Sequence, residues 1–261
     1  MGLITFLTDF QTKDHYIASV KAKILSENPA AQIVDITHNI NMYDIAHAAF
    51  VLNSCYKDFP KGTIHLIDVH SLSKHIKGFF AVKIKGHFFI SADNGIFSLL
   101  DENDPEEIVE LPYEGVNSFP GRDILAPAAA ALANGKVLKD LGKAAKEVQR
   151  MLNRELRITE DAIIGNVAHV DHYGNLITNI RSDVFEMTRR NRNFTIKIGR
   201  EHMDKIDPFY NSVGEGDSVA IFNSNHFLEI AINQGNAAEL LGVRYDSSVS
   251  IQFGGQAFGI L

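Results

Sequence analysis

The first half of the chain alternates short apolar segments with segments in which apolar residues recur every three or four positions. The short segments are typical of buried strands, and the three-to-four repeat is typical of one face of a helix. Strands are expected at residues 3–7, 32–36, 63–68, 79–84 and 87–91, and helices at 15–26, 44–56 and 123–134. This order favours a mixed or parallel sheet with flanking helices, so we expect an α/β, sandwich-like N-terminal domain.

The pattern changes near residue 155. From residue 162 onward the apolar segments are short, and clusters of turn residues separate them, which is typical of antiparallel strands. Strands are expected at residues 163–170, 176–180, 194–198, 218–222, 227–231 and 248–253. We therefore expect two domains, 1–155 and 156–261, the second a small antiparallel barrel or sandwich.

A polar segment, 171–179, interrupts the alternating pattern of this second half. It displays Asp171, Tyr173 and Asn175 around Gly174. Asp and Asn are poor strand residues, and a glycine inside a strand pattern marks a bulge or the close approach of another group. An amide beside an aromatic ring suits adenine, which needs a stacking face and hydrogen bonds along its edge. A tight hairpin turn with Gly174 and Asn175 at its tip explains the same residues, and both interpretations stay open.

Carboxylates also follow the first and third strands. Asp9 and Asp14 lie in the loop before the first helix, and Asp68 ends the third strand. Ligands of open α/β sheets bind beyond the carboxyl ends of the strands, where Asp9 could accept both hydroxyls of a ribose. For Asp14 the local pattern favours a helix cap, as it does for Asp123 before the alanine-rich helix. Asp68 suits a site residue and an ordinary loop residue equally well.

Composition and charge narrow the possible functions. A net charge of −7 and a pI near 5.9 argue against nucleic acid or an anionic membrane as a partner. No apolar run approaches the roughly 20 residues that span a bilayer, and Cys55, the single cysteine, is expected in the core. These features lead us to expect a cytoplasmic protein.

The sequence lacks the usual signatures of metal and phosphate sites. Eleven histidines are present, but none forms the His-Glu-x-x-His pair of a metal-binding helix, so we expect no metal. The loop at residues 8–14 contains no glycine, which excludes the usual dinucleotide and phosphate-loop fingerprints. The expected ligand is a nucleoside that has no phosphate, or one whose 5′ substituent is cationic.

These motifs, taken in order, resemble the S-adenosylmethionine (SAM) hydroxide adenosyltransferases, relatives of the enzymes that halogenate the same substrate. The resemblance spans nearly the whole chain. Its motifs are Thr8-Asp9-Phe10 with Asp14, Val34-Asp35-Ile36-Thr37-His38, Gly62-Thr63 through Asp68, Asp93-Asn94-Gly95, Phe119 with Gly121-Arg122-Asp123, Ala126-Pro127-Ala128-Ala129, Asp171 with Gly174-Asn175-Leu176-Ile177-Thr178-Asn179-Ile180, and Phe227-Leu228-Glu229-Ile230-Ala231.

The resemblance implies a fold, an assembly and a set of site residues. It implies an N-terminal α/β domain, a C-terminal β-barrel and a homotrimer whose site lies between neighbouring subunits, with SAM as substrate and no cofactor. In this sequence the implied roles are ribose binding by Asp9, contacts to the methionine part by Asp14, Asp171 and Ser224, stacking on adenine by Tyr173 and Tyr210, bonding of its edge by Asn175, and preparation of the attacking water by Asp68.

The sequence departs from this family where water is handled. The arginine expected after Asp68 is missing, and Pro120 stands where the family has a histidine. The basic residues that could replace them are His70, Lys74, His75 and Lys77. The leading hypothesis is hydrolysis of SAM to adenosine and methionine. The alternative is a protein that binds SAM or adenosine with weak or no turnover, and the charge of Asp68 disfavours halide transfer.

Overall fold

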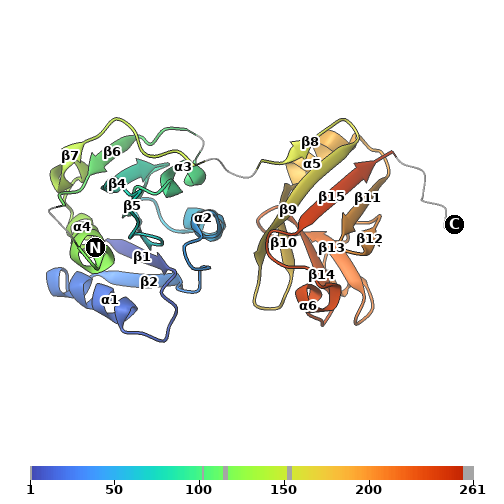
Figure 1. Ribbon diagram of the computed structural model, residues 1–261, viewed down its shortest axis with the longest axis horizontal. Coiled ribbons are helices and arrows are strands. Elements are labelled where there is room, and N and C mark those ends of the chain that lie inside the picture. Colours follow the sequence, from blue (N-terminus) through green and yellow to red (C-terminus); the bar gives the residue numbers. More distant parts are fainter. Residues whose placement is uncertain (1, 102, 114–116, 152–154, 255–261) are drawn as a thin grey trace. The chain divides into compact units, whose positions relative to one another are not determined.

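The computed structural model describes residues 2–101, 103–113, 117–151 and 155–254 (Figure 1). The chain forms two compact units, Met1–Asn153 and Arg154–Leu261.

The N-terminal unit is built on a seven-stranded mixed sheet with the order β2-β1-β3-β5-β4-β6-β7. Its strands are β1 (Leu3–Thr8), β2 (Gln32–Thr37), β3 (Ile64–Asp68), β4 (Phe79–Ile84), β5 (His87–Ala92), β6 (Glu107–Glu110) and β7 (Lys143–Ala144). The strands β2, β1, β3 and β5 run parallel, and β4, β6 and β7 join in antiparallel pairs. The expected α/β domain is confirmed.

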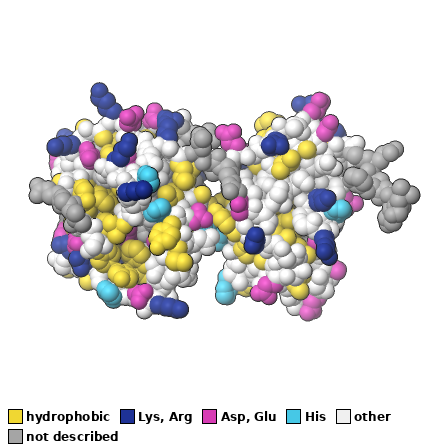
Figure 2. All heavy atoms as spheres, viewed as in Figure 1, with side chains coloured by type: hydrophobic (Ala, Val, Ile, Leu, Met, Phe, Trp, Pro, Cys, Tyr) yellow, Lys and Arg dark blue, Asp and Glu magenta, His cyan; other side chains and the backbone are white. Residues whose placement is uncertain are grey.

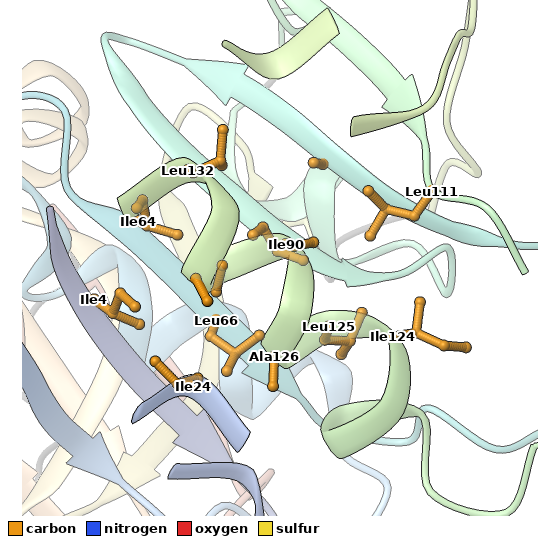
Figure 3. Close-up of a cluster of buried hydrophobic side chains, with 14 of the residues drawn as sticks. Ile4, Ile24, Ile64, Leu66, Ile90, Leu111, Ile124, Leu125, Ala126 and Leu132 are labelled. Carbon is orange, nitrogen blue, oxygen red and sulfur yellow. The ribbon is translucent and has the colours of Figure 1, made fainter. Parts of the chain in front are cut away.

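Helices cover the two faces of this sheet. They are α1 (Tyr16–Glu27), α2 (Ile45–Asn53), α3 (Ile96–Leu100) and α4 (Ala126–Ala133). Alternation along β3 sends Leu66 into the core formed with α1 and α4, and Ile67 into the core formed with α2 and α3. Figure 3 shows part of the first core, in which Leu66 and Ile90 of the sheet and Leu125 of the segment before α4 belong to one buried cluster.

The segment before α4 differs from the sequence expectation. Residues Gly121–Leu125 form a π-helical turn, and the N-cap position is Pro120. The prediction that Asp123 caps the helix is wrong, because its carboxylate instead pairs with the neighbouring Arg122, with 2.6 Å between Nε and Oδ1. Single π-helical turns within α-helices are common at functional sites.

The structure also defines where the second helix begins and ends and where a short third helix begins. The second helix begins after Asp44, whose side chain accepts the N–H of His47, and it ends at Asn53 rather than continuing to residue 56. Asp93-Asn94-Gly95 forms a turn that leads from β5 into the short helix α3.

The C-terminal unit is a nearly closed antiparallel barrel. Its strands follow the order β12-β11-β15-β9-β10-β14-β13, with β8 paired to β9. They are β8 (Arg157–Ile158), β9 (Ala162–Val170), β10 (Leu176–Arg181), β11 (Phe194–Ile198), β12 (Glu201–Met203), β13 (Ser218–Phe222), β14 (Phe227–Ile232) and β15 (Ser248–Phe253). Two short helices were not expected, α5 (Ser182–Arg189) and α6 (Ala237–Leu241). Phe185 of α5 is fully buried in the barrel core.

A chain of buried polar side chains crosses three parallel strands. Thr5 Oγ1 lies 2.7 Å from Nδ1 of His65, whose Nε2 lies 3.2 Å from Nδ1 of His87. His65 has no exposed surface, and Tyr56 packs edge-on against both imidazoles. Burial lowers the pKa of His65 to about 3, with a further contribution from His87. Both histidines are therefore neutral in the folded protein near pH 7.

We expect the contribution of His65 to the free energy of unfolding to fall as pH decreases below 6.5, whereas the raised pKa of Asp68 makes a contribution of opposite sign. The unfolded chain gains a proton on His65 near pH 6.5, whereas the folded chain gains it only near pH 3, so the stability is present above pH 6.5 and lost on acidification. Each pH unit in this window costs up to about 1.4 kcal/mol. Denaturant unfolding between pH 7.5 and pH 4 measures the slope.

The matched variants are His65→Phe, and His202→Phe at an exposed position. Relative to the wild type, His65→Phe should lower by close to one proton the slope with which stability increases with pH, whatever its effect on absolute stability, and His202→Phe should leave the slope unchanged. An unaltered slope in His65→Phe would contradict the assignment.

Candidate functional site

The pairing of β1 with β3 brings two of the expected site residues together. Thr8 and Asp68 are partners in the parallel register, so Asp9 begins its loop beside Asp68. The Asp9 carboxylate accepts the backbone N–H of Tyr43 at 2.9 Å, which ties the loop after β1 to the loop before α2. The carboxyl end of the sheet therefore carries the two carboxylates that sequence analysis placed there.

Asp68 is a buried carboxyl with an unoccupied oxygen. Its exposed fraction is 2%, and its Oδ2 has no hydrogen-bond partner among the described residues. Burial raises the pKa of Asp68 to about 7, the nearby Ser71 hydroxyl opposes this rise, and the charge of Asp9 adds to it. A carboxyl with this pKa exchanges a proton near neutral pH, as a general base must.

The π-helical turn packs directly on this carboxyl. A Cβ atom at Gly121 would lie 1.7 Å from Oδ2 of Asp68, so no larger residue fits at position 121 without displacing Asp68. The turn therefore closes one side of the carboxyl with backbone rather than with a side chain.

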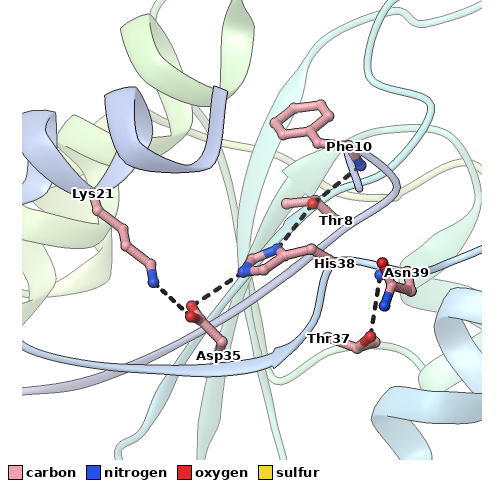
Figure 4. A network of polar contacts seen from close by, with 7 residues as sticks. All are labelled: Thr8, Phe10, Lys21, Asp35, Thr37, His38 and Asn39. Atoms are coloured by element: carbon pink, nitrogen blue, oxygen red, sulfur yellow. Dashed lines mark hydrogen bonds and ion pairs between the residues drawn. The ribbon is translucent and has the colours of Figure 1, made fainter. Parts of the chain in front are cut away.

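A second polar network fixes the loop that carries Asp9 (Figure 4). Thr8 Oγ1 accepts the backbone N–H of Phe10 and lies 3.0 Å from Nδ1 of His38. His38 Nε2 lies 3.2 Å from Asp35, which also binds Lys21 at 2.5 Å. Burial lowers the pKa of His38, and Asp35 opposes the effect. His38 belongs to one of the sequence motifs, but no role was predicted for it.

Three residues with left-handed backbone surround the same end of the sheet. They are Gln11 after β1, Tyr43 before α2 and His70 after β3, with φ of 61°, 64° and 48°. Residues other than glycine are strained at these angles, and such strain clusters at functional sites. The rings of Tyr43 and His70 meet edge to face at 5.3 Å.

The remaining basic candidates lie farther out in the N-terminal unit. Lys74, His75 and Lys77 are exposed, and Lys77 acts electrostatically on Asp93. Asp14 is also exposed. The interpretation of Asp14 as a helix cap is wrong, because the N-cap position of α1 is His15 and no side chain makes a capping hydrogen bond there.

In the C-terminal unit, the loop between β9 and β10 is held by its own polar groups. Asp171 accepts the backbone N–H groups of Tyr173 and Asn175 and the side-chain amide of Asn175, each at 2.9 Å. Gly174 has φ of 83°, and a Cβ there would lie 1.9 Å from Oδ1 of Asn236. The segment is therefore a tight hairpin turn, although its tip is formed by His172 and Tyr173 rather than by Gly174 and Asn175, and it leaves Tyr173 75% exposed.

A buried carboxylate organises the rest of this half. Glu229, 3% exposed in the middle of β14, accepts the Tyr210 hydroxyl at 2.6 Å and the Asn223 amide at 3.0 Å. Burial and this hydrogen bond raise the pKa of Tyr210, and the charge of Asp171 adds to the rise. Tyr210 thus lies within the electrostatic range of Asp171, and Ser224 follows Asn223 in an exposed turn. No role was predicted for Glu229 from the sequence, although a carboxylate inside an apolar strand indicates a buried polar contact.

The described residues contain no group of three or more His, Cys, Asp or Glu side chains arranged to hold a metal ion. In the same part of the chain, no helix has both the length and the apolar character needed to cross a membrane.

Comparison with known families gives a match in each unit. Residues 4–142 match the SAM hydroxide adenosyltransferase N-terminal domain, and residues 165–250 match the C-terminal domain. The chain belongs to the SAM hydroxide adenosyltransferase family. The resemblance seen in the sequence is confirmed.

Relatives of this family member align over nearly their full length. A protein of Methanocaldococcus jannaschii named (R)-S-adenosyl-L-methionine hydrolase is 29% identical over 266 residues, or 96% of each chain. A Thermus thermophilus protein of the same name is 30% identical, covering 94% of this chain and 97% of its own. A fluorinase of Actinoplanes is 24% identical over 88% of this chain and 91% of its own.

A solved structure supports the same relationship. The crystal structure of an uncharacterized conserved protein from Thermotoga maritima superposes with a TM-score of 0.87 at 31% identity. The match covers 95% of this chain and 99% of that one.

We expect Gly121→Ala to destabilise the fold by about 1–3 kcal/mol, the usual cost of overpacking. The added Cβ collides with Asp68, so the cost should shrink in an Asp68→Ala background, and a double-mutant cycle of unfolding free energies measures this coupling. Gly214→Ala is the control, because its Cβ meets only the exposed Asp217 carboxylate at 2.8 Å. Equal costs of Gly121→Ala in both backgrounds would rule out the contact.

Proposed function

We propose that this protein hydrolyses SAM to adenosine and methionine, acting on the (R) form named for its relatives. The observation that carries the proposal is the buried Asp68 carboxyl beside Asp9 at the carboxyl end of β3. Family membership supports the substrate. The chain also aligns over nearly its full length with proteins named as hydrolases of that substrate.

The reaction requires few catalytic groups from the protein. Water attacks C5′ of the ribose, the C5′–S bond breaks, and its electron pair stays on sulfur. Methionine leaves as a neutral thioether, so the leaving group needs no general acid. The attacking water gives up one proton, and Asp68 is the residue we assign to accept it before it passes to solvent.

The binding roles follow from the two halves of the site. In the N-terminal half, Asp9 binds the ribose hydroxyls, with its loop fixed by Tyr43 and Thr8, and Asp14 faces the methionine part. The barrel half adds stacking on adenine by Tyr173 and Tyr210, a bond to its edge by Asn175, and methionine contacts by Asp171 and Ser224. A cytoplasmic location, expected from the sequence, remains a prediction.

We also propose a homotrimer in which one subunit's barrel completes its neighbour's site. Hydrophobic side chains gather on the face of the N-terminal unit seen in Figure 2. Large apolar side chains are exposed on the edge strand β2 and in the loop after it: Val34 at 41%, Met42 at 70% and Tyr43 at 66%. Exposed apolar side chains that lie close in sequence favour a protein partner, and Tyr43 also binds Asp9.

The second candidate function is binding of SAM or adenosine with little turnover. The observations that favour it are Pro120 at the start of the π-helical turn and the exposure of Lys74, His75 and Lys77. Product analysis separates the two functions, because only the hydrolase forms adenosine and methionine from SAM.

We expect Asp68→Asn to lower turnover roughly 100-fold or more while ligand affinity changes little, because a base acts in the transition state. In the wild type, kcat/KM should rise with pH through about 7, as the Asp68 carboxylate of the free enzyme becomes populated above its pKa. Chromatographic product analysis from pH 5.5 to 9, beside calorimetric titration with SAM and adenosine, measures both effects. A wild type that binds SAM yet forms no adenosine would establish the binding function instead.

Mixed trimers test the shared site. Asp68→Asn disables the N-terminal half and Tyr210→Ala the barrel half, so neither homotrimer should turn over at the wild-type rate. Co-expression of the two variants should restore activity at about a quarter of the sites, where two unaltered halves meet. Light scattering confirms the trimer. Mixed samples no more active than the separate variants would contradict a site shared between subunits.

A further inference from the structure

The loop after β3 carries two buried oxygens that lack hydrogen-bond partners. They are Oδ2 of Asp68 and Oγ of Ser71, whose residues are 2% and 7% exposed, and neither atom has a partner among the described residues. The Ser71 hydroxyl nevertheless lies close enough to the Asp68 carboxyl to oppose the rise in its pKa. Burying a polar oxygen without a partner is destabilising, and a bound water is the usual remedy.

The backbone between these two residues is held in a strained turn. His70 has φ of 48°, in the left-handed region, and lies in the bend between Val69 and Ser71. Val69 is buried in the core with α2 and α3, and its carbonyl accepts the Asn94 amide at 2.9 Å. The His70 ring also packs on Tyr43, so contacts on both sides fix the loop before any ligand binds.

We propose that Ser71 Oγ and Asp68 Oδ2 together hold the attacking water, and that the left-handed turn at His70 positions Ser71 for this role. The inference rests on the proposed hydrolysis and adds a residue to it. Ser71 accepts one hydrogen bond from the water, and Asp68 accepts the other and then the proton. As water oxygen bonds to C5′, the C5′–S electron pair goes to sulfur, and the proton leaves Asp68 for solvent.

The structure offers a matched control in Ser91. Its hydroxyl is also buried and unpartnered, but it lies two residues after Phe89 on β5, on the sheet face that packs against α2 and α3. Asp68 alternates with Leu66 and faces the opposite side, where Gly121 packs on it. Replacing either serine by alanine removes one buried hydroxyl, and only one of them adjoins Asp68.

The test compares Ser71→Ala with Ser91→Ala in a turnover assay with SAM. Ser71→Ala should lower kcat roughly 2- to 10-fold, the usual effect of losing a hydrogen bond between neutral groups. KM should change little, because the water is not part of the bound substrate. Ser91→Ala should retain the wild-type kcat. Equal kcat in Ser71→Ala and wild type, with wild type active, overturns the inference and leaves the proposed function standing.

A second measurement does not depend on turnover. Carbon-13 NMR of the aspartate carboxyls, with the Asp68 signal identified by its loss in Asp68→Asn, follows its titration without substrate. Ser71 and Asp9 are the groups whose interactions with this carboxyl shift its pKa, and neither changes in Ser91→Ala. Ser71→Ala should move the Asp68 midpoint to higher pH, and Ser91→Ala should not. An unmoved midpoint in Ser71→Ala overturns the pairing even if the wild type proves to be only a binding protein.

Variants at His70 separate the role of its backbone from that of its imidazole. Asparagine tolerates the left-handed region, whereas valine does not. His70→Val should therefore lose more turnover than His70→Asn, with Ser71 displaced in the first and held in the second. Equal losses in the two variants would overturn the assignment of a backbone role. His75→Asn, at an exposed position of the same loop, should behave as the wild type.

Discussion

The parallel pairing of β1 with β3 is the constraint on which the N-terminal site depends. It fixes Thr8 opposite Asp68, so the loop that follows each strand starts from the same edge of the sheet. The hydrogen bonds of Thr8 then hold the backbone on either side of Asp9, and Gly121 packs against Asp68 from the π-helical turn. A shift of one residue in this register would turn Asp68 into the opposite core, because side chains alternate across a strand.

Two of the buried carboxylates, Glu229 and Asp68, have opposite hydrogen-bond environments. Both oxygens of Glu229 are occupied, one by the Tyr210 hydroxyl and the other by the Asn223 amide. These two hydrogen bonds orient its neighbours, so Glu229 suits a structural role in the barrel half. Asp68 keeps one oxygen unpaired, and burial brings its pKa to about 7. The free oxygen and the perturbed pKa are what suit Asp68 to chemistry.

Local patterns predicted the elements well and the contacts between distant residues poorly. The strand ends at Asp9 and Asp68 could be located, because hydrophobic periodicity marks where a strand stops. The contact of Gly121 with Asp68 and the hydrogen bond from Tyr210 to Glu229 join residues 53 and 19 positions apart, and no local pattern encodes them. The predictions that Asp14 and Asp123 cap helices were wrong, because capping preferences take no account of competing partners, such as Arg122 for Asp123. The helix α5 was not predicted, because its eight residues form too few turns to show a clear helical periodicity.

The charge of the proposed substrate bears on when Asp68 acts as a base. In the free site, burial and the neighbouring Asp9 charge favour the protonated carboxyl. A sulfonium cation bound beside these two carboxylates favours their ionised forms, because an opposite charge within several ångströms stabilises the carboxylate. Substrate binding would therefore lower the pKa of Asp68 and release its proton before water attacks. An arginine is one way to keep such a carboxylate ionised, and a cationic substrate can supply part of the same field, so a site without that arginine can still form its base.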